Sequence, residues 1–471
     1  MNAAVLTSLF EQWANALVET MTALPRAGSN RVYYRMTGGG KTAVGAFGRN
    51  AAENRAFTAL AETLRKNGIA APEIYGKGGG GFYYLQEDLG DTSLYDLLQT
   101  DAAPALLQQA VEQLARIQVN GAEGFDWTQA YPTATFDRRT IYNDLHYFKY
   151  NFLKFTGIEF DEWLLEDDFD RLVRCVLPSG DCPFLMYRDF QSRNIMVQEG
   201  GTLRFIDFQD ARRGPLAYDL ASFLFQARAG FSDAQRDTLL RHYIRAVEKL
   251  TPVSQDEFIT QFYIFSFFRG LQTLGAYGFR GLFEKKSLFL QSIPAALHNL
   301  RNLIGSGKLD GLQTPYLFDC IHRIVPEKFT PQKTDSLTVT IYSFAFKNGY
   351  PDDFTGHGGG FVFDCRGLHN PGRIDEFKNL TGRDNAVAEY IEHQPAVKDF
   401  LLHIFAILDN SVANYTIRRF SDLYVAFGCT GGQHRSVYCA ERTAAYLSGK
   451  YCVNVRLIHR EQHLEQNIQA V

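Results

Sequence analysis

The chain has 471 residues, of which 45% are hydrophobic and 21% are charged. This length predicts two or three folding units, and this composition excludes a disordered or fibrous chain. The 48 lysines and arginines are balanced by 52 acidic residues, so the formal net charge is −4 and no overall positive field attracts nucleic acid. No stretch approaches 18 uncharged apolar residues, which argues against a membrane-spanning protein.

The N-terminal residues 1–13 lack a basic leader and have the pattern of an amphipathic helix, so we predict a cytoplasmic protein. The seven cysteines give neither a disulfide framework nor a paired zinc motif. Four histidines of the C-terminal part show no metal-ligand spacing, and we predict no structural metal. These histidines are His357, His369, His434 and His459.

The first half of the chain predicts a small sheet lobe followed by a large helical lobe. Residues 31–47 form two β-rich runs around three glycines, which predicts a hairpin, and residues 51–67 carry apolar side chains at helical spacing. A third β-rich run covers residues 82–86. Residues 104–322 are mainly helical in pattern. Short apolar strands are expected within them at 184–187, 195–197 and 203–206.

Residues 326–336 concentrate Pro, Lys, Thr and Asp without helical periodicity, which predicts a linker. The pattern then alternates between strands and helices, which is typical of a compact α/β domain. We expect strands at 337–344, 361–364 and 422–427, and helices at 385–412 and 437–447. The predicted domains are therefore residues 1–325 and residues 337–471.

Three polar residues near short strands predict a phosphotransferase catalytic loop. Asp189 and Asn194 are five residues apart, and Asp207 follows thirteen residues later at the end of an apolar strand. Phosphoryl transfer to a hydroxyl needs a carboxylate that accepts the proton and oxygen ligands that hold Mg²⁺ against nucleotide phosphates. This spacing assigns Asp189 as the base and Asn194 and Asp207 as metal ligands.

With these motifs in place, residues 1–325 resemble the aminoglycoside phosphotransferase and choline kinase superfamily. The segments that carry a closer resemblance, to bacterial anomeric kinases of N-acetylmuramate and N-acetylglucosamine, are IDFQDARRGPLAYDLASFL at 206–224, LQEDLG at 85–90 and FFRGLQTLGAYGFRGLFEKKSLFLQSIP at 267–294. The resemblance implies an α+β bilobal protein-kinase-like fold, ATP as the phosphoryl donor, and a sugar 1-phosphate product used in cell-wall recycling.

The same resemblance assigns the small lobe to nucleotide binding. Ala27 to Asn30 match the loop that covers the phosphates, and residues 87–89 match the hinge that contacts adenine through its backbone. Glu53 matches a helix glutamate that in the family pairs with a strand lysine, but residues 42–47 contain no cation. We therefore expect Lys41, Arg35 or Arg49 to contact the phosphates. The predicted nucleotide-binding residues are Gly28, Ser29, Arg35, Lys41, Glu53, Glu87 and Leu89.

A second motif, GCTGGQHRS at 428–436, lies between a predicted strand and a predicted helix. Glycines let backbone N–H groups point into one concavity, the helix adds the positive end of its dipole, and an arginine can contact an oxyanion with two N–H groups. The motif predicts a site for phosphate or a sugar phosphate. Its residues are Cys429, Thr430, Gly431, Gly432, His434, Arg435 and Ser436.

The same residues also match the phosphate loop of cysteine-dependent phosphatases, in which Cys429 would attack phosphorus and an Asp would act as general acid. Asp364 is the candidate acid. This alternative predicts a reactive thiol at Cys429.

Residues 337 to about 460 resemble the C-terminal domain of the RNase adapter RapZ. The matching segments are IYSFAFKNGYP at 341–351, FVFDCRGLHNP at 361–371, LTGRDNAVAEYIEHQPAVKDFL at 380–401 and CTGGQHRSVYCAERTAAYL at 429–447. The resemblance implies binding of a sugar phosphate or of small regulatory RNA. However, residues 337–471 carry four lysines and nine arginines against fourteen acidic residues, so the charge gives RNA little support.

Besides the phosphatase, the sequence supports two hypotheses about the function of the whole chain. The first is a sugar kinase, with ATP and Mg²⁺ as cofactors, joined to a domain that senses a sugar phosphate. The second is a regulatory RNA-binding adapter whose kinase lobe has become a ligand sensor, which the absent strand lysine permits.

Overall fold

A computed structural model describes residues 3–24, 31–178, 180, 182–284, 286–329, 336–353 and 359–469. The chain divides into two compact units. The first comprises Met1–Gly278 and Ser292–Pro326, and the second comprises Phe279–Gln291 and Glu327–Val471. The segment Phe279–Gln291, which the predicted first domain includes, thus groups with the second unit.

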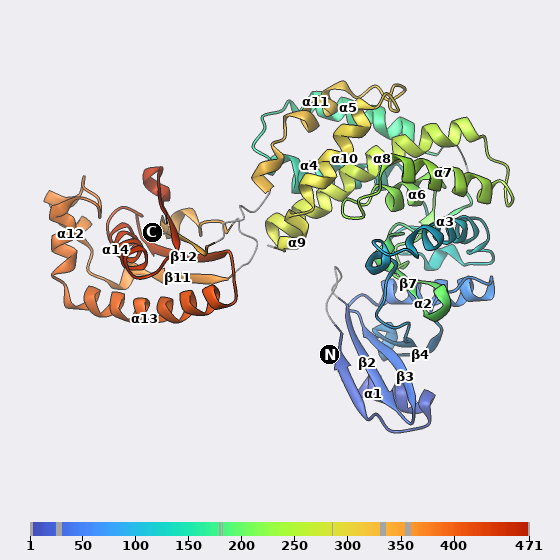
Figure 1. Ribbon diagram of the computed structural model, residues 1–471, viewed down its shortest axis with the longest axis horizontal. Coiled ribbons are helices and arrows are strands. Elements are labelled where there is room, and N and C mark those ends of the chain that lie inside the picture. Colours follow the sequence, from blue (N-terminus) through green and yellow to red (C-terminus); the bar gives the residue numbers. More distant parts are fainter. Residues whose placement is uncertain are drawn as a thin grey trace. The chain divides into compact units, whose positions relative to one another are not determined.

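The first unit begins with an antiparallel sheet of five strands in the order β1-β2-β3-β5-β4 (Figure 1). The elements of this small lobe are α1 (Ala3–Ala14), β1 (Thr20–Ala23), β2 (Val32–Gly38), β3 (Lys41–Phe47), α2 (Ala51–Lys66), β4 (Ile74–Gly78) and β5 (Tyr83–Glu87). The predicted hairpin is confirmed, because β2 pairs with β3 across a turn in which Gly39 and Gly40 have positive φ. The α1 helix packs Leu6 and Phe10 on one face of the sheet. The α2 helix packs Phe57 on the other face.

The rest of the first unit is mainly helical. Its elements are α3 (Ala103–Asn120), α4 (Arg138–Asn151), α5 (Glu162–Val176), β6 (Leu185–Met186), β7 (Ile195–Val197), β8 (Leu203–Phe205), β9 (Arg212–Arg213), α6 (Ala217–Leu224), α7 (Asp233–Val247), α8 (Gln255–Gly278), α10 (Ile293–Gly305) and α11 (Pro315–Arg323). The α8 helix packs against α4, α6 and α10, and its Phe262, Phe267 and Leu271 are fully buried. A helix that is apolar on several sides forms the centre of a helical core.

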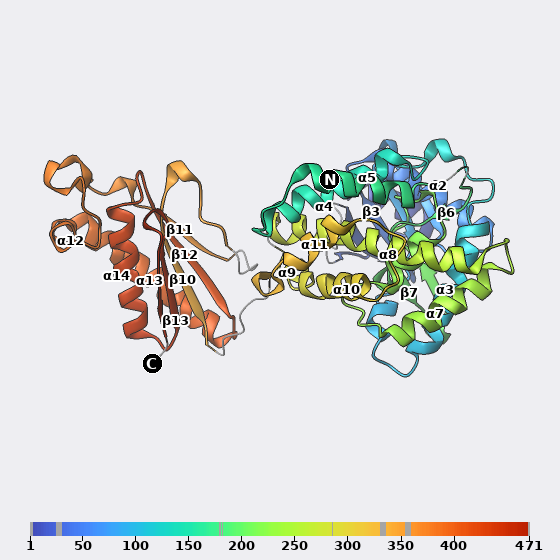
Figure 2. The ribbon, with the colours of Figure 1, turned by 90° about the horizontal axis from the view of Figure 1, so that it is seen from above.

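The second unit contains a five-stranded sheet in the order β11-β12-β10-β13-β14. Its elements are α9 (Ser287–Leu290), β10 (Thr338–Ala345), β11 (Gly360–Asp364), α12 (Asn385–Glu392), α13 (Pro395–Ile417), β12 (Asp422–Cys429), α14 (Arg435–Lys450), β13 (Asn454–His459) and β14 (Leu464–Ile468). The strands are parallel except β14, which pairs antiparallel with β13. Residues of α12, α13 and α14 belong to one core with alternate residues of β10 and β12, so the three helices pack on the same face of this sheet. Figure 2 shows α14 beside the strands.

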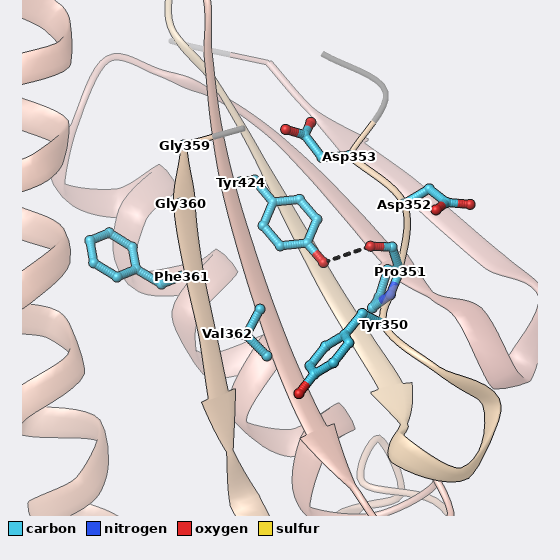
Figure 3. Close-up of a pocket in the computed structure, with 9 residues that line it drawn as sticks. All are labelled: Tyr350, Pro351, Asp352, Asp353, Gly359, Gly360, Phe361, Val362 and Tyr424. Carbon is cyan, nitrogen blue, oxygen red and sulfur yellow. Dashed lines mark hydrogen bonds between the residues drawn. The ribbon is translucent and has the colours of Figure 1, made fainter. Parts of the chain in front are cut away.

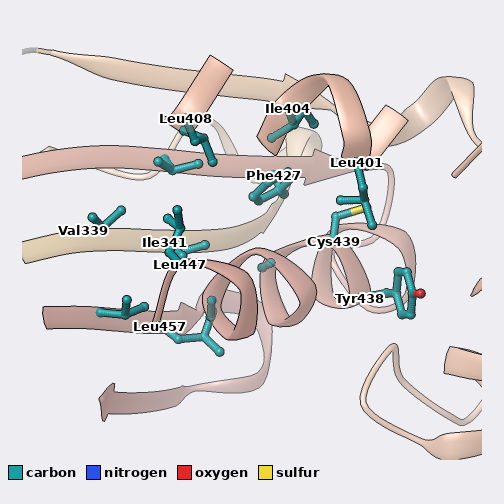
Figure 4. Close-up of a cluster of buried hydrophobic side chains, with 14 of the residues drawn as sticks. Val339, Ile341, Leu401, Ile404, Leu408, Phe427, Tyr438, Cys439, Leu447 and Leu457 are labelled. Carbon is teal, nitrogen blue, oxygen red and sulfur yellow. The ribbon is translucent and has the colours of Figure 1, made fainter. Parts of the chain in front are cut away.

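The core of the second unit lies between the sheet and these helices (Figure 4). Val339 and Ile341 of β10 and Phe427 of β12 face Leu408 of α13 and Leu447 of α14, and all five are buried. Successive side chains of a strand point to opposite faces, so every second residue of these strands enters this core. The predicted α/β domain is confirmed.

Two sequence expectations for the second unit differ from the structure. The helix predicted over 385–412 is two helices, α12 and α13, because Pro395 lacks an amide proton and occupies the first turn of α13. Strands β13 and β14 were not predicted, although residues 454–459 have the alternating burial of a strand with one face in the core.

The α13 helix is the one helix of the described ranges that is long and apolar enough to cross a membrane by length and composition. Its Ile404, Leu408 and Val412 belong to the core of the second unit. A core helix passes the same test, so α13 is weak support for a membrane location.

Candidate functional site

The structure brings the three predicted catalytic-loop residues together. The Asn194 side-chain amide donates from Nδ2 to the backbone oxygen of Asp189 (2.8 Å) and to Oδ2 of Asp207 (3.3 Å). The β7–β8 hairpin fixes this arrangement, because Ile206 N donates to the backbone oxygen of Asn194 (3.0 Å). A carboxylate and an amide thus meet beside the loop that carries Asp189.

A buried carboxylate holds the start of this loop. Asp219, in the first turn of α6, is fully buried and accepts hydrogen bonds from Tyr187 N (2.7 Å) and Arg188 N (2.8 Å). It also accepts from Nε2 of Gln118 (3.0 Å). Burial raises the pKa of Asp219 to about 6, although the two backbone amides act in the opposite direction. The backbone just before Asp189 is therefore tied to the helical core.

The residues next to the catalytic groups have unusual backbone angles. Arg188 and Asp207 have φ of 77° and 69°, a region that non-glycine residues rarely adopt. The Arg188 guanidinium is held by the Asp144 carboxylate (2.8 Å) and by the Tyr218 hydroxyl (2.7 Å). Strained backbone supported by such contacts is concentrated at functional sites.

Asp210 is a further carboxylate of the first unit. Burial and the negative charge of Asp189 raise its pKa to about 6, and Glu53 acts in the same direction, whereas Arg188 and Arg212 act against it. Asp189 and Glu53 thus both act electrostatically on Asp210.

Glu53 is paired with an arginine that the sequence reasoning missed. Arg31, immediately before β2, places Nη2 2.8 Å from Oε1 of Glu53 and donates from Nε to Oδ1 of Asn54 (3.2 Å). Arg31 is only 4% exposed. The one signal in the sequence is an arginine at the start of a strand that runs beside the strand leading into α2.

The structure does not bring the predicted cations Arg35 and Lys41 to Glu53. Arg35 forms ion pairs with Asp88 (2.6 Å) and Asp91 (2.8 Å), after β5. Lys41 donates to the backbone oxygen of Ala14 (3.2 Å), at the end of α1. Both side chains are therefore engaged elsewhere in the small lobe.

The remaining predicted nucleotide residues fall into two groups. Gly28 and Ser29 lie outside the described residues. Glu87 ends β5, where its carboxylate accepts from Nη1 of Arg204 (3.0 Å), and Leu89 is buried. The Glu87 amide also donates to the backbone oxygen of Glu73 (2.9 Å), and the backbone contact of residues 87–89 with a base stays a prediction.

In the second unit, the CTGGQHRS residues form a tight loop between β12 and α14. The Gly432 amide donates to Sγ of Cys429 (3.2 Å), and this sulfur lies 3.1 Å from Oγ of Ser436. Cys429, Gly432 and Ser436 are buried, whereas Thr430 and Gly431 are exposed. The loop lies at the carboxyl end of the parallel strands and at the N-terminus of a helix, a place that favours an anion.

Arg435 supports this loop from within. Its Nη1 donates to the backbone oxygens of Arg366 (3.0 Å) and Leu368 (2.9 Å), and its Nη2 is 3.4 Å from Oγ1 of Thr430. Its Nε is buried and has no hydrogen-bond partner among the described residues. The backbone carbonyls occupy only Nη1 of the guanidinium, so the predicted two-point contact of Arg435 with an oxyanion, through Nε and Nη2, stays a prediction. Thr430 and Gly431 are the exposed residues at the start of the loop.

Histidines of the second unit have structural hydrogen bonds. His459 Nδ1 lies 2.8 Å from the Ser343 hydroxyl, and its Nε2 lies 3.1 Å from the Glu441 carboxylate. His434 Nε2 lies 3.0 Å from a main-chain oxygen before α12. His357 lies outside the described residues. The Ser343–His459–Glu441 chain is one that sequence reasoning missed, because it joins β10, β13 and α14.

The candidate phosphatase acid is poorly suited to its role. Asp364 forms an exposed ion pair with Arg366 (2.7 Å). Hydrogen bonds from Arg366 lower the pKa of Asp364, whereas a general acid must carry a proton near neutral pH.

A surface pocket of about 360 Å³ lies elsewhere in the second unit (Figure 3). The Tyr424 hydroxyl in it donates to the backbone oxygen of Pro351 (3.0 Å). Its lining residues are Tyr350, Pro351, Asp352, Asp353, Gly359, Gly360, Phe361, Val362 and Tyr424. None of the predicted anion-binding residues lines this pocket. The pocket therefore does not coincide with the candidate anion site, which is identified by the geometry of the loop.

The first unit thus has a kinase-like fold with an antiparallel sheet and a helical lobe, and the second is a separate, smaller α/β domain. Residues 20–253 match the phosphotransferase enzyme family, and residues 337–463 match the RapZ C-terminal domain. The chain therefore carries a phosphotransferase family domain at its N-terminus and a RapZ C-terminal domain at its C-terminus. The family assignment supports a kinase-like phosphotransferase.

Two curated relatives are nucleotide-binding proteins. The chain is 41% identical to one of Xylella fastidiosa strain M12 over 141 residues, which are 30% of this chain and 47% of that protein. It is 38% identical to one of Limosilactobacillus fermentum over 138 residues, which are 29% of this chain and 45% of that protein. The chain spans about half the length of these relatives.

Two solved structures are also similar. An ethanolamine kinase of Plasmodium vivax has a TM-score of 0.46 and 16% identity, covering 61% of this chain and 84% of that one. The choline kinase LicA of Streptococcus pneumoniae has a TM-score of 0.44 and 13% identity, covering 65% of this chain and 98% of that one.

Proposed function

We propose that the chain is a cytoplasmic ATP-dependent kinase that phosphorylates the anomeric hydroxyl of an amino sugar, N-acetylmuramate or N-acetylglucosamine, in cell-wall recycling. The observation that supports this most directly is the meeting of Asn194 with Asp189 and Asp207. The sugar itself comes from the resemblance of residues 206–224 and 267–294 to anomeric sugar kinases.

The donor atoms beside Asp189 fit Mg²⁺. Because Asn194 donates through Nδ2, its Oδ1 is left to act as a ligand next to the Asp207 carboxylate. Mg²⁺ prefers such oxygen ligands and usually takes one or two from the protein and the rest from phosphates and water. Among the described residues, no group of three or more His, Cys, Asp or Glu could hold a metal ion.

Asp189 accepts the proton of the sugar hydroxyl in this proposal. Asp219 and Asp144 keep the preceding backbone and the Arg188 side chain in place, so that the carboxylate of Asp189 stays at the acceptor hydroxyl. Asn194 and Asp207 hold Mg²⁺, and Glu87 to Leu89 contact adenine through the backbone. ATP and Mg²⁺, when bound, supply the phosphoryl group and neutralise its charge.

The test is release of ADP by the purified full chain with N-acetylmuramate, N-acetylglucosamine or an aminoglycoside. We expect turnover with one of the two amino sugars, and the Asp189→Asn variant should lose about 10²–10⁴-fold in kcat. Asp167→Asn, a change at an exposed carboxylate of α5, serves as the control and should retain activity. Full turnover by Asp189→Asn would show that another group is the base.

For the second domain, we propose that the loop 429–436 binds a phosphate or a sugar phosphate and so senses a phosphorylated sugar. The position of the loop at a helix N-terminus and the exposure of Thr430 and Gly431 support this. A thermal shift of the second unit with sugar phosphates, but not with the free sugars, is the expected result. A shift with RNA alone would favour the regulatory adapter instead.

A further inference from the structure

We propose that Arg31 contacts the nucleotide phosphates and takes the place of the lysine that is missing from β3. This inference rests on the proposed function of the first unit. In protein kinases, a strand lysine contacts the phosphates and is paired with a glutamate of the following helix. Here Glu53 of α2 is present, and its partner is Arg31.

The position of Arg31 follows from the pairing of β2 with β3. Val32 is paired with Phe47, the last residue of β3, so Arg31 lies where β3 leaves the sheet for α2. Its guanidinium reaches two residues in the first turn of α2, Oε1 of Glu53 (2.8 Å) and Oδ1 of Asn54 (3.2 Å). Two acceptors on one helical turn fix the plane of the guanidinium.

A chain of ring contacts connects Arg31 with the metal ligand Asp207. The Arg31 guanidinium lies 5.8 Å from the centre of the Phe57 ring. The Phe57 ring stacks on Phe208, the residue after Asp207, at 4.8 Å and an interplanar angle of 15°. Arg31 and Asp207 also act on the same hydroxyl: burial raises the pKa of Tyr84, Arg31 lowers it and Asp207 raises it. Arg31 therefore lies on the face of the small lobe that packs against the residue after Asp207.

Two other cations of the small lobe, Lys41 and Arg35, lie elsewhere. Lys41 is paired with Gly38 at the far end of the hairpin, about 20 Å along β3 from Phe47 at roughly 3.4 Å per residue. It also lies over the Trp13 ring of α1. Arg35 is engaged by the carboxylates that follow β5. Of these three residues, Arg31 is the one that contacts Glu53.

An arginine suits this position chemically. A guanidinium can donate to Glu53 with one edge and to a phosphate with another, which a lysine ammonium cannot do in a fixed plane. Burial by itself lowers the pKa of Arg31, but Tyr84, Tyr33 and Glu53 raise it overall. The side chain is therefore charged whenever a nucleotide is present.

The experiment compares binding of ATP and adenosine by calorimetry, using the full chain without a sugar. Adenosine keeps the base and lacks the phosphates. We expect Arg31→Met to weaken ATP binding by about 10- to 100-fold, the value of a charge-assisted hydrogen bond, and to leave adenosine binding unchanged. The control is Lys77→Met, which removes an exposed ion pair between β4 and α2 (2.7 Å) and should change neither affinity.

Equal losses of ATP and adenosine affinity would overturn the proposal, because they would show that Arg31 only supports the fold. So would an unchanged ATP affinity. If Arg31→Met does not fold, Arg31→Lys provides the same comparison. We then expect a smaller loss of ATP affinity and an unchanged adenosine affinity. Failure of the wild-type chain to bind ATP would instead contradict the proposed function, so the two failures are distinguishable.

Discussion

The most direct test of how the catalytic loop is held is the substitution Asp219→Ala. The Asp219 carboxylate accepts hydrogen bonds from Tyr187 N, Arg188 N and the Gln118 amide, at 2.7, 2.8 and 3.0 Å. Alanine leaves the two backbone amides without this acceptor, whereas the Gln118 amide keeps its contact with the backbone oxygen of Leu216 (3.1 Å). Each donor left unpaired costs about 1–3 kcal/mol, so we expect about 2–6 kcal/mol in total. At about 2 °C per kcal/mol, the melting temperature of the first unit should fall by roughly 4–12 °C.

The assay is scanning calorimetry of the full chain, combined with hydrogen exchange at the Tyr187 and Arg188 amides. Asp219→Asn keeps one acceptor oxygen and should fall between wild type and alanine. Asp233→Asn is the control, because Asp233 is 80% exposed and its ion pair with Arg236 should contribute less than about 1 kcal/mol. Asp219 does not hold the loop if Asp219→Ala has the same melting temperature as the control and its Tyr187 and Arg188 amides exchange at the wild-type rate.

Two further predictions concern Asp210 and the loop of the second unit. The pKa of Asp210 is raised to about 6 from an ordinary value near 3.8, so its protonated form is favoured on folding and its contribution to stability is lost as the pH rises through 6. The melting temperature of Asp210→Asn minus that of wild type should therefore increase as the pH rises from 4.5 to 7.5. A constant difference across this range would contradict the raised pKa of Asp210. Gly432 has φ of 70°, and a Cβ there would lie 2.4 Å from Cγ of Glu461 and 2.9 Å from N of Ala345. Gly432→Ala should destabilise the second unit by roughly 1–3 kcal/mol, whereas Gly449→Ala, at an open position of α14, should stabilise it by up to about 1 kcal/mol. Thermal melting of the two variants compares them, and equal melting temperatures would refute the strain at Gly432.

The catalytic loop could be predicted because its geometry is local. Asp189, Asn194 and Asp207 lie within 19 residues, on one short loop and one hairpin. Their spacing is therefore fixed by elements that the sequence pattern itself indicates. What the spacing could not show is the support from Asp219 and Gln118, which comes from helices folded against the loop.

The small-lobe cation could not be predicted for the opposite reason. A search for the partner of Glu53 begins on the strand directly before α2, where the family has its lysine. Arg31 lies one strand earlier and reaches Glu53 only because β2 and β3 are antiparallel and bring its position beside the start of α2. Such a pairing depends on strand register, which composition and periodicity do not specify.

The loop of the second unit shows that a motif can indicate a local turn without showing the distant partners of one of its residues. The pattern of Cys429, Gly432 and Ser436 correctly indicates a tight turn at the start of a helix, because these residues bond to one another within the motif. Arg435 lies in the same motif, yet its partners are the carbonyls of residues 366 and 368, about seventy positions away in the sequence. Removing Arg435 would leave those buried carbonyls unpaired, so a loss of anion binding on its substitution would not by itself identify a ligand contact.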